Sequence, residues 1–148
     1  MKKNNSHTTT GTLVLKDKSV FHGTSFGAPV SISGEVVFAT GMVGYPEAFT
    51  DPSFRGQILV LTYPLIGNYG VPKKELWESD KLQIAGLIVA SYNDTPSHDT
   101  SVETLSAWLK REGIPALEIK DTRFLAKKLR DEGVTLGKII AGKNSVTL

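Results

Sequence analysis

The sequence contains no cysteine among its 148 residues. This absence excludes disulfide bonds, thiolate metal ligands and a cysteine nucleophile, so any chemistry must rely on other side chains. The chain also has no apolar run near the roughly 20 residues of a membrane span, and no signal-peptide core follows its basic start. We therefore expect a soluble protein without a membrane partner, located in the cytoplasm, with a mitochondrial location as the alternative.

An excess of one charge is also missing, because 17 Lys and Arg stand against 15 Asp and Glu, a net charge of +2. Charges of both signs are interspersed along the chain and form no basic cluster that would bind a polyanion, so we expect no nucleic-acid partner. The pI near 8.8 still keeps a nucleic-acid-binding module open as a rival interpretation. With 40% hydrophobic residues, the chain can bury the core of a single compact domain.

Short apolar runs separated by turn residues predict an α/β fold. The strands are expected at residues 13–15, 20–21, 36–38, 57–62, 84–90, 115–119 and 136–141. Helical spacing and capping residues predict helices at residues 100–113 and 122–132. The first half therefore predicts antiparallel hairpins, and the β-α-β-α-β order of the second half predicts parallel pairing.

The stretch from residue 34 to residue 70 is unusually dense in Gly, Pro, Thr and Asp. It contains two expected strands and, between them, one expected helical turn at residues 46–49, where Pro46 suits the first helical position. Its glycines Gly41 and Gly44 match neither the Walker A pattern nor the dinucleotide fingerprint, so no nucleotide cofactor is indicated. So much specific loop chemistry calls for a functional reason.

Polar clusters give weak signals for catalysis or metal binding. Ser97, His98 and Asp99 are consecutive, and three neighbouring side chains cannot stack in a catalytic relay. His7, His22 and His98 lack the spacing of a metal pair, so no metal is expected. We interpret all of these groups as solvated loop residues.

Paired carboxylates and a basic helix face are two further candidate sites. Glu35 could pair with Glu47 or Asp51 as acid and base, but surface charge or helix capping is the commoner role of such groups. The second helix carries the basic residues Arg123, Lys127, Lys128 and Arg130. Acidic neighbours favour a solvated face there. An autonomous enzyme that uses Glu47, Asp51 or His98 remains a second rival interpretation.

The loop motifs carry a resemblance to a known family. GEVVF, TGMVGYPE, TDPSF, QIL and TYPLIGNYG, all within residues 34–70, closely resemble the N-terminal domain of the small, glutamine-hydrolysing subunit of carbamoyl phosphate synthetase. The likeness continues on both sides and covers all of the chain except its N-terminal tail. The amino-acid sequence of the loop is more similar to that of the eukaryotic fused form than to that of the separate bacterial subunit.

The resemblance implies a three-layer β/β/α domain, in which antiparallel hairpins pack on a small, mainly parallel sheet covered by helices. The corresponding division of the chain is a flexible tail at residues 1–11, the small-subunit N-terminal domain at residues 12–142, and the start of a linker to an absent glutaminase domain at residues 143–148. The polar tail cannot bury enough surface to offset its ordering entropy.

The resemblance also implies a division of labour. In the family, a downstream glutaminase domain supplies the catalytic Cys, and a large synthetase subunit uses ATP, Mg²⁺ and bicarbonate to make carbamoyl phosphate. This chain would then be a noncatalytic part of the enzyme, without a cofactor of its own, with the glutaminase domain and the synthetase portion as partners. Whether the parent serves pyrimidine or arginine synthesis stays open.

One site residue follows from the resemblance. Ser53 matches the family serine that reaches across the domain boundary to help hold the substrate glutamine. The alternative is that Ser53 only caps a turn. A departure from the family pattern lies in the hairpin turn Asp17-Lys18-Ser19, where relatives carry Asp-Gly. If Lys18 adopts φ > 0, we expect a cost on the order of 1 kcal/mol; the alternative is that the turn is of a different type.

Overall fold

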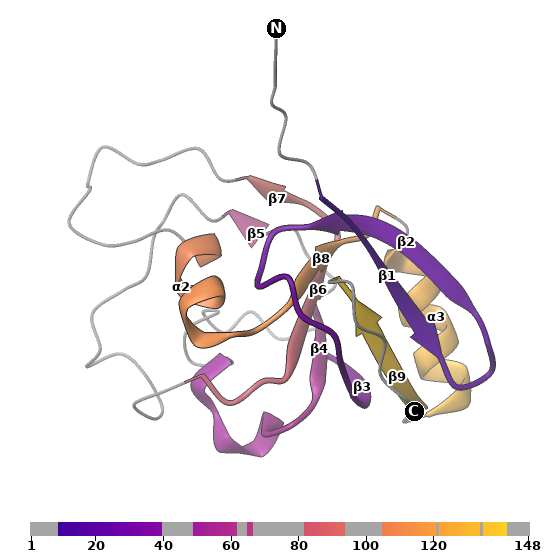
Figure 1. Ribbon diagram of the computed structural model, residues 1–148. Helices are drawn as coiled ribbons and strands as arrows, with labels where there is room; N and C mark the ends of the chain where they lie inside the picture. Colours follow the sequence, from indigo (N-terminus) through magenta and orange to yellow (C-terminus); the bar gives the residue numbers. More distant parts are fainter. Residues whose placement is uncertain are drawn as a thin grey trace, which may run out of the picture.

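The computed structural model describes residues 9–39, 49–61, 65–66, 82–93, 105–120, 122–133 and 135–141. Its main feature is a seven-stranded sheet that closes into a barrel in the order β1-β2-β8-β6-β4-β3-β9 (Figure 1). These strands are β1 (Thr9–Leu15), β2 (Val20–Ser25), β3 (Ile32–Ala39), β4 (Ile58–Leu61), β6 (Gly86–Val89), β8 (Ala116–Glu118) and β9 (Thr135–Ile140). Two α-helices accompany the barrel, so the α/β class is confirmed.

The remaining elements lie outside the barrel sheet. They are the α-helices α2 (Leu105–Glu112) and α3 (Thr122–Glu132), the 3-10 helix η1 (Pro52–Phe54), and the strands β5 (Leu65–Ile66) and β7 (Tyr92–Asn93). β5 and β7 pair in parallel as a separate two-stranded sheet. Within the described ranges, no helix combines the length and the apolar character needed to cross a membrane.

The barrel has a parallel half and an antiparallel half. β3, β4, β6 and β8 pair in parallel. β1 pairs antiparallel with β2 and β9, and β9 pairs antiparallel with β3. The predicted hairpin β1–β2 is confirmed, but the predicted parallel pairing of the last strand is wrong. β9 inserts between β1 and β3, where it closes the barrel, and hydrophobic periodicity does not specify which neighbours a strand takes.

The first strand begins earlier than expected. Thr9, Thr10 and Gly11 pair with Ser25, Thr24 and Gly23, so these three residues belong to β1 rather than to a tail ending at residue 11. A threonine-rich segment suits a strand because its side chains are β-branched, and backbone pairing needs no apolar face. Residues 1–8 lie outside the described part, as do the expected linker at 143–148 and residues 46–48 of the expected helical turn.

Two hydrophobic clusters lie on opposite faces of the parallel strands. Alternate residues of β4 divide between them, with Leu59 and Leu61 in one and Ile58 and Val60 in the other. All four are fully buried, which confirms the prediction that this strand is covered on both sides. α2 packs on the first cluster, whereas α3 packs with β1, β2 and β9 on the second.

The turn between β1 and β2 confirms the expectation for Lys18, whose φ is 77°. The Lys18 N–H donates to the Leu15 C=O at 2.8 Å, and the Leu15 N–H donates to the Ser19 C=O at 2.9 Å. This is a three-residue hairpin loop with its last residue in the left-handed region, a position that favours glycine.

Replacing Lys18 with Gly should therefore stabilise the protein by about 1 kcal/mol, because the left-handed strain of a side chain is removed. Urea unfolding followed by far-UV circular dichroism measures the change. Lys16→Gly is the matched control, since Lys16 is an exposed lysine of the same loop without positive φ. An equal gain at both positions would contradict the strain argument.

Candidate functional site

The sequence-predicted site residue, Ser53, lies in the middle of η1. Asp51 begins this turn with extended backbone angles, and its Oδ1 accepts a hydrogen bond from the Ser53 N–H at 3.0 Å. Pro52 occupies the first helical position, where its missing N–H is not needed. The turn continues through N–H groups of Phe54 and Arg55 that donate to Asp51 and Pro52 carbonyls. The backbone of Ser53 is therefore fixed from both sides.

The next residues attach this turn to the barrel. The Gly56 N–H donates to the Gln83 C=O at 3.1 Å, and the Ala85 N–H donates to the Gln57 C=O at 2.8 Å. Phe54 packs against the cluster that contains the fully buried Phe49. Ser53 itself is exposed. An exposed hydroxyl on an anchored turn is a suitable geometry for contacting a ligand or a second domain.

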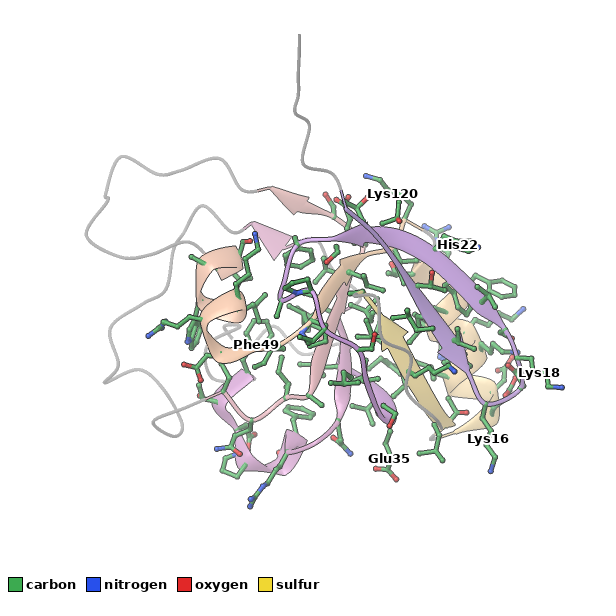
Figure 2. The ribbon with its side chains drawn as sticks, viewed as in Figure 1. Lys16, Lys18, His22, Glu35, Phe49 and Lys120 are labelled. Carbon is green, nitrogen blue, oxygen red and sulfur yellow. The ribbon has the colours of Figure 1, made fainter. Side chains whose placement is uncertain are left out.

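Glu35 lies at the same amino-terminal edge of the parallel strands. Its Oε1 accepts a hydrogen bond from Gln57 Nε2 at 3.2 Å, and Figure 2 shows its side chain pointing away from the barrel. Asp51 serves as the cap of η1. Both carboxylates are thus engaged in local bonds of the kind expected for surface and capping groups. Glu47, their third possible partner, lies outside the described residues.

Of the other candidate catalytic and metal-binding residues, only His22 lies in the part of the chain that the structure describes. His22 is exposed on β2. His7, Ser97, His98 and Asp99 are beyond the described ranges, as are Gly41 and Gly44. Among the residues that are described, no three His, Cys, Asp or Glu side chains gather in a metal-binding group.

The basic residues of α3 divide into two kinds. Arg123, Lys127 and Arg130 are exposed, in agreement with a solvated face. Lys128 instead bridges two elements, since its Nζ lies 2.6 Å from Asp17 Oδ2 and 3.0 Å from Glu132 Oε2. This contact joins α3 to the β1–β2 turn. It was missed in the sequence because the two residues are far apart in the chain and of types that are usually solvated.

The ion pair shifts the pKa values of both Asp17 and Lys128. The hydrogen bond from Lys128, assisted by Ser19, lowers the pKa of Asp17 to about 2. The hydrogen bonds to Asp17 and Glu132 raise the pKa of Lys128. The link therefore stays fully charged at neutral pH. It positions the hairpin turn and shows no feature of a catalytic pair.

The described residues thus define a small α/β barrel domain that displays an anchored, exposed turn at one edge. Comparison with known proteins identifies its family. The chain belongs to the family described as carbamoyl-phosphate synthase small chain, CPSase domain, whose model matches residues 13–139. This finding confirms the resemblance seen in the loop motifs.

Individual relatives are of two kinds. The chain is 49% identical over 148 residues to the multifunctional protein pyr-3 of Neurospora crassa (92% of this chain, 8% of that protein). It is 56% identical over 137 residues to the multifunctional protein CAD of Squalus acanthias (87% and 6%). It is also 51% identical over 140 residues to the arginine-specific carbamoyl phosphate synthase small chain of Neosartorya fischeri (89% and 31%). The chain therefore spans less than a third of each relative.

Proposed function

We propose that this chain is the noncatalytic N-terminal domain of a glutamine-dependent carbamoyl phosphate synthetase. In this role it docks on the synthetase portion and completes one wall of the glutamine site. The family match across residues 13–139 carries the proposal. The absence of cysteine agrees with a domain that leaves glutamine hydrolysis to a separate glutaminase domain. ATP, Mg²⁺ and bicarbonate would act in the synthetase portion.

Ser53 is the residue that we propose for contact with glutamine. Its N–H is taken by Asp51, so the side-chain hydroxyl is the group that can donate to a carboxylate or accept from an amine. The anchored turn keeps this hydroxyl at one position on the surface, which lowers the ordering cost of binding a ligand at a domain boundary.

We also propose that the barrel corresponds to two layers of the three-layer β/β/α arrangement that the resemblance implies. The parallel and the antiparallel strands share one hydrophobic cluster, as two facing layers would. The helix α2 would then supply the third layer, since it packs on the other face of β4 and β6.

Reconstitution tests the docking role. The purified chain is mixed with a synthetase portion and a glutaminase domain that lack this domain, and glutamine-dependent carbamoyl phosphate formation is measured. We expect the chain to restore this activity, because it completes the interface and the glutamine site. Ammonia-dependent synthesis by the synthetase portion is the control. If the chain neither binds the other two parts nor restores the activity, the proposal is refuted.

A separate experiment tests Ser53. In the full enzyme, Ser53→Ala should raise the KM for glutamine about tenfold, the effect of losing one hydrogen bond to a charged group, and should leave ammonia-dependent synthesis unchanged. Ser33→Ala is the matched control, because Ser33 is an exposed serine on β3 whose backbone partner is Lys138 of β9 rather than a residue of η1. Unchanged glutamine kinetics in the Ser53 variant would remove this residue from the site.

A further inference from the structure

The shortest strand pairing in the barrel is the one between β2 and β8. These two strands pair only at Thr24 with Glu118 and at Ser25 with Leu117, whereas β1 follows β2 from Ser25 to Val20. The pairing ends at Thr24, although Gly23 still lies against β8, where an added Cβ would be 2.5 Å from the Glu118 O atom. A groove of about 480 Å³ is lined by residues 20–24 of β2 and residues 118–120. β2 lies across the closed barrel from β4 in strand order, so this groove is distinct from the Ser53 turn.

Backbone groups of β2 face into this groove. The Ser19 C=O accepts from Leu15 of β1, and the Phe26 N–H donates to Ala116 of β8. Backbone groups alternate in direction along a strand, so Val20 and His22 direct their N–H and C=O groups to the β8 side, as Phe26 does. In the described part of the chain, no backbone partner is found for Val20 or His22 on that side. This length of β2 is an open strand edge.

The surroundings of the edge are apolar and basic. Val20 and Phe124 are 49% and 56% exposed, and the Phe124 ring lies 6.1 Å from the ring of Phe21, which lines the groove. Figure 2 shows Lys16 and Lys18 at the turn of the β1–β2 hairpin, His22 on β2, and Lys120 near the other end of the hairpin. Two ion pairs are formed here, Asp17 with Lys128 and Glu118 with Lys120. Among the described residues this leaves Lys16 and Lys18 without an acidic partner, so the uncompensated charge at the hairpin turn is positive.

From these features we infer that the β2 edge binds an extended, acidic peptide segment of a partner protein, which adds to the barrel as a short strand alongside residues 20–22 of β2. Main-chain hydrogen bonds to Val20 and His22 supply the affinity, as in other cases of strand addition. Apolar side chains of the segment pack on Val20 and Phe124, and its acidic side chains face Lys16 and Lys18. A second copy of this chain is a poor occupant, because its own β2 edge carries the same positive charge.

A defined peptide pair tests the inference on the full chain. The probe is a blocked, fluorescein-labelled octapeptide of alternating valine and glutamate, and its control has lysine in place of glutamate. By fluorescence anisotropy at low salt, we expect the acidic peptide to bind at least about tenfold more tightly than the basic one, and added salt to weaken its binding. Equal affinities, or preference for the lysine peptide, would overturn the charge argument.

The backbone contact is tested by two substitutions of one residue. His22→Pro removes the N–H that faces the groove but no N–H that faces β1, whereas His22→Ala removes only the side chain. We expect the proline variant to bind the acidic peptide about tenfold more weakly than the alanine variant. Equal binding by two folded variants would overturn the proposal.

Hydrogen exchange on the unmodified chain keeps the inference testable if the proline variant does not fold. The acidic peptide should slow exchange of the Val20 and His22 amides, because these groups become hydrogen-bonded in the complex. Unchanged exchange at both amides, or protection confined to another part of the barrel, would overturn it. So would protection of the same amides by self-association without peptide, since the occupant would then be a second copy.

Discussion

Replacing Trp108 with Ala is expected to lower the free energy of unfolding by about 3–5 kcal/mol, the range for truncating a large aromatic side chain in a core. Trp108 is fully buried on α2. It belongs to the cluster that joins this helix to Phe49, Leu61 and Leu87. Truncation would leave a cavity between α2 and the parallel strands, which the surrounding side chains fill only in part.

Urea unfolding followed by circular dichroism at 222 nm measures this effect without depending on tryptophan fluorescence. Lys110→Ala is the matched control, because Lys110 is exposed on the same helix and Ala suits a helix at least as well. We expect the control to stay within about 0.5 kcal/mol of the unmodified protein. A loss below about 1 kcal/mol for Trp108→Ala would mean that α2 is not packed as described.

Elements with a strong local signal could be predicted from the sequence. β4 was recognised because Ile58 to Leu61 is apolar on both faces, which requires cover on both sides. α3 was recognised because Leu125 and Leu129 recur at helical spacing, and both are buried. In each case the residues that identify the element are the residues that bury its surface.

The closure of the barrel could not be predicted in the same way. Whether β9 pairs with β8 or inserts between β1 and β3 depends on contacts between segments far apart in the chain, and these leave no period in the sequence. The extension of β1 to Thr9 was missed for a related reason, since backbone pairing rather than side-chain burial holds Thr9 to Gly11. Local patterns predict elements, whereas pairing partners are decided by the whole sheet.

The candidate site shows the same division. The Asp-Pro-Ser order predicted a turn at Ser53, and the cap by Asp51 bears this out. The role of Ser53 toward glutamine came from resemblance to the family, because a hydroxyl on a turn has no ligand-specific pattern of its own. The open edge of β2 had no sequence signal either, since it arises where the pairing of β2 with β8 ends.

Replacing Gly27 with Ala is the second change with a large expected effect, a loss of about 3 kcal/mol from steric overlap and weakened hydrogen bonds. A Cβ at this position would lie 2.6 Å from both the Ala116 N and the Ile114 O atoms. The neighbours of Gly27 make the bonds at risk, because the Phe26 N–H donates to Ala116 and the Ala28 N–H donates to Ile114.

The overlap at Gly27 is with backbone, so no side-chain rotation relieves it and the β2–β3 connection must move away from β8. Gly133→Ala provides the control. Gly133 has φ of 75° and nothing within 4 Å of an added Cβ, so it should lose only about 1 kcal/mol through backbone strain. Urea unfolding of both variants measures the difference. Equal losses would show that the contact of Gly27 with β8 is looser than described. A larger loss at Gly27 would show that this contact stabilises the junction of β2 and β8, next to the open edge of β2.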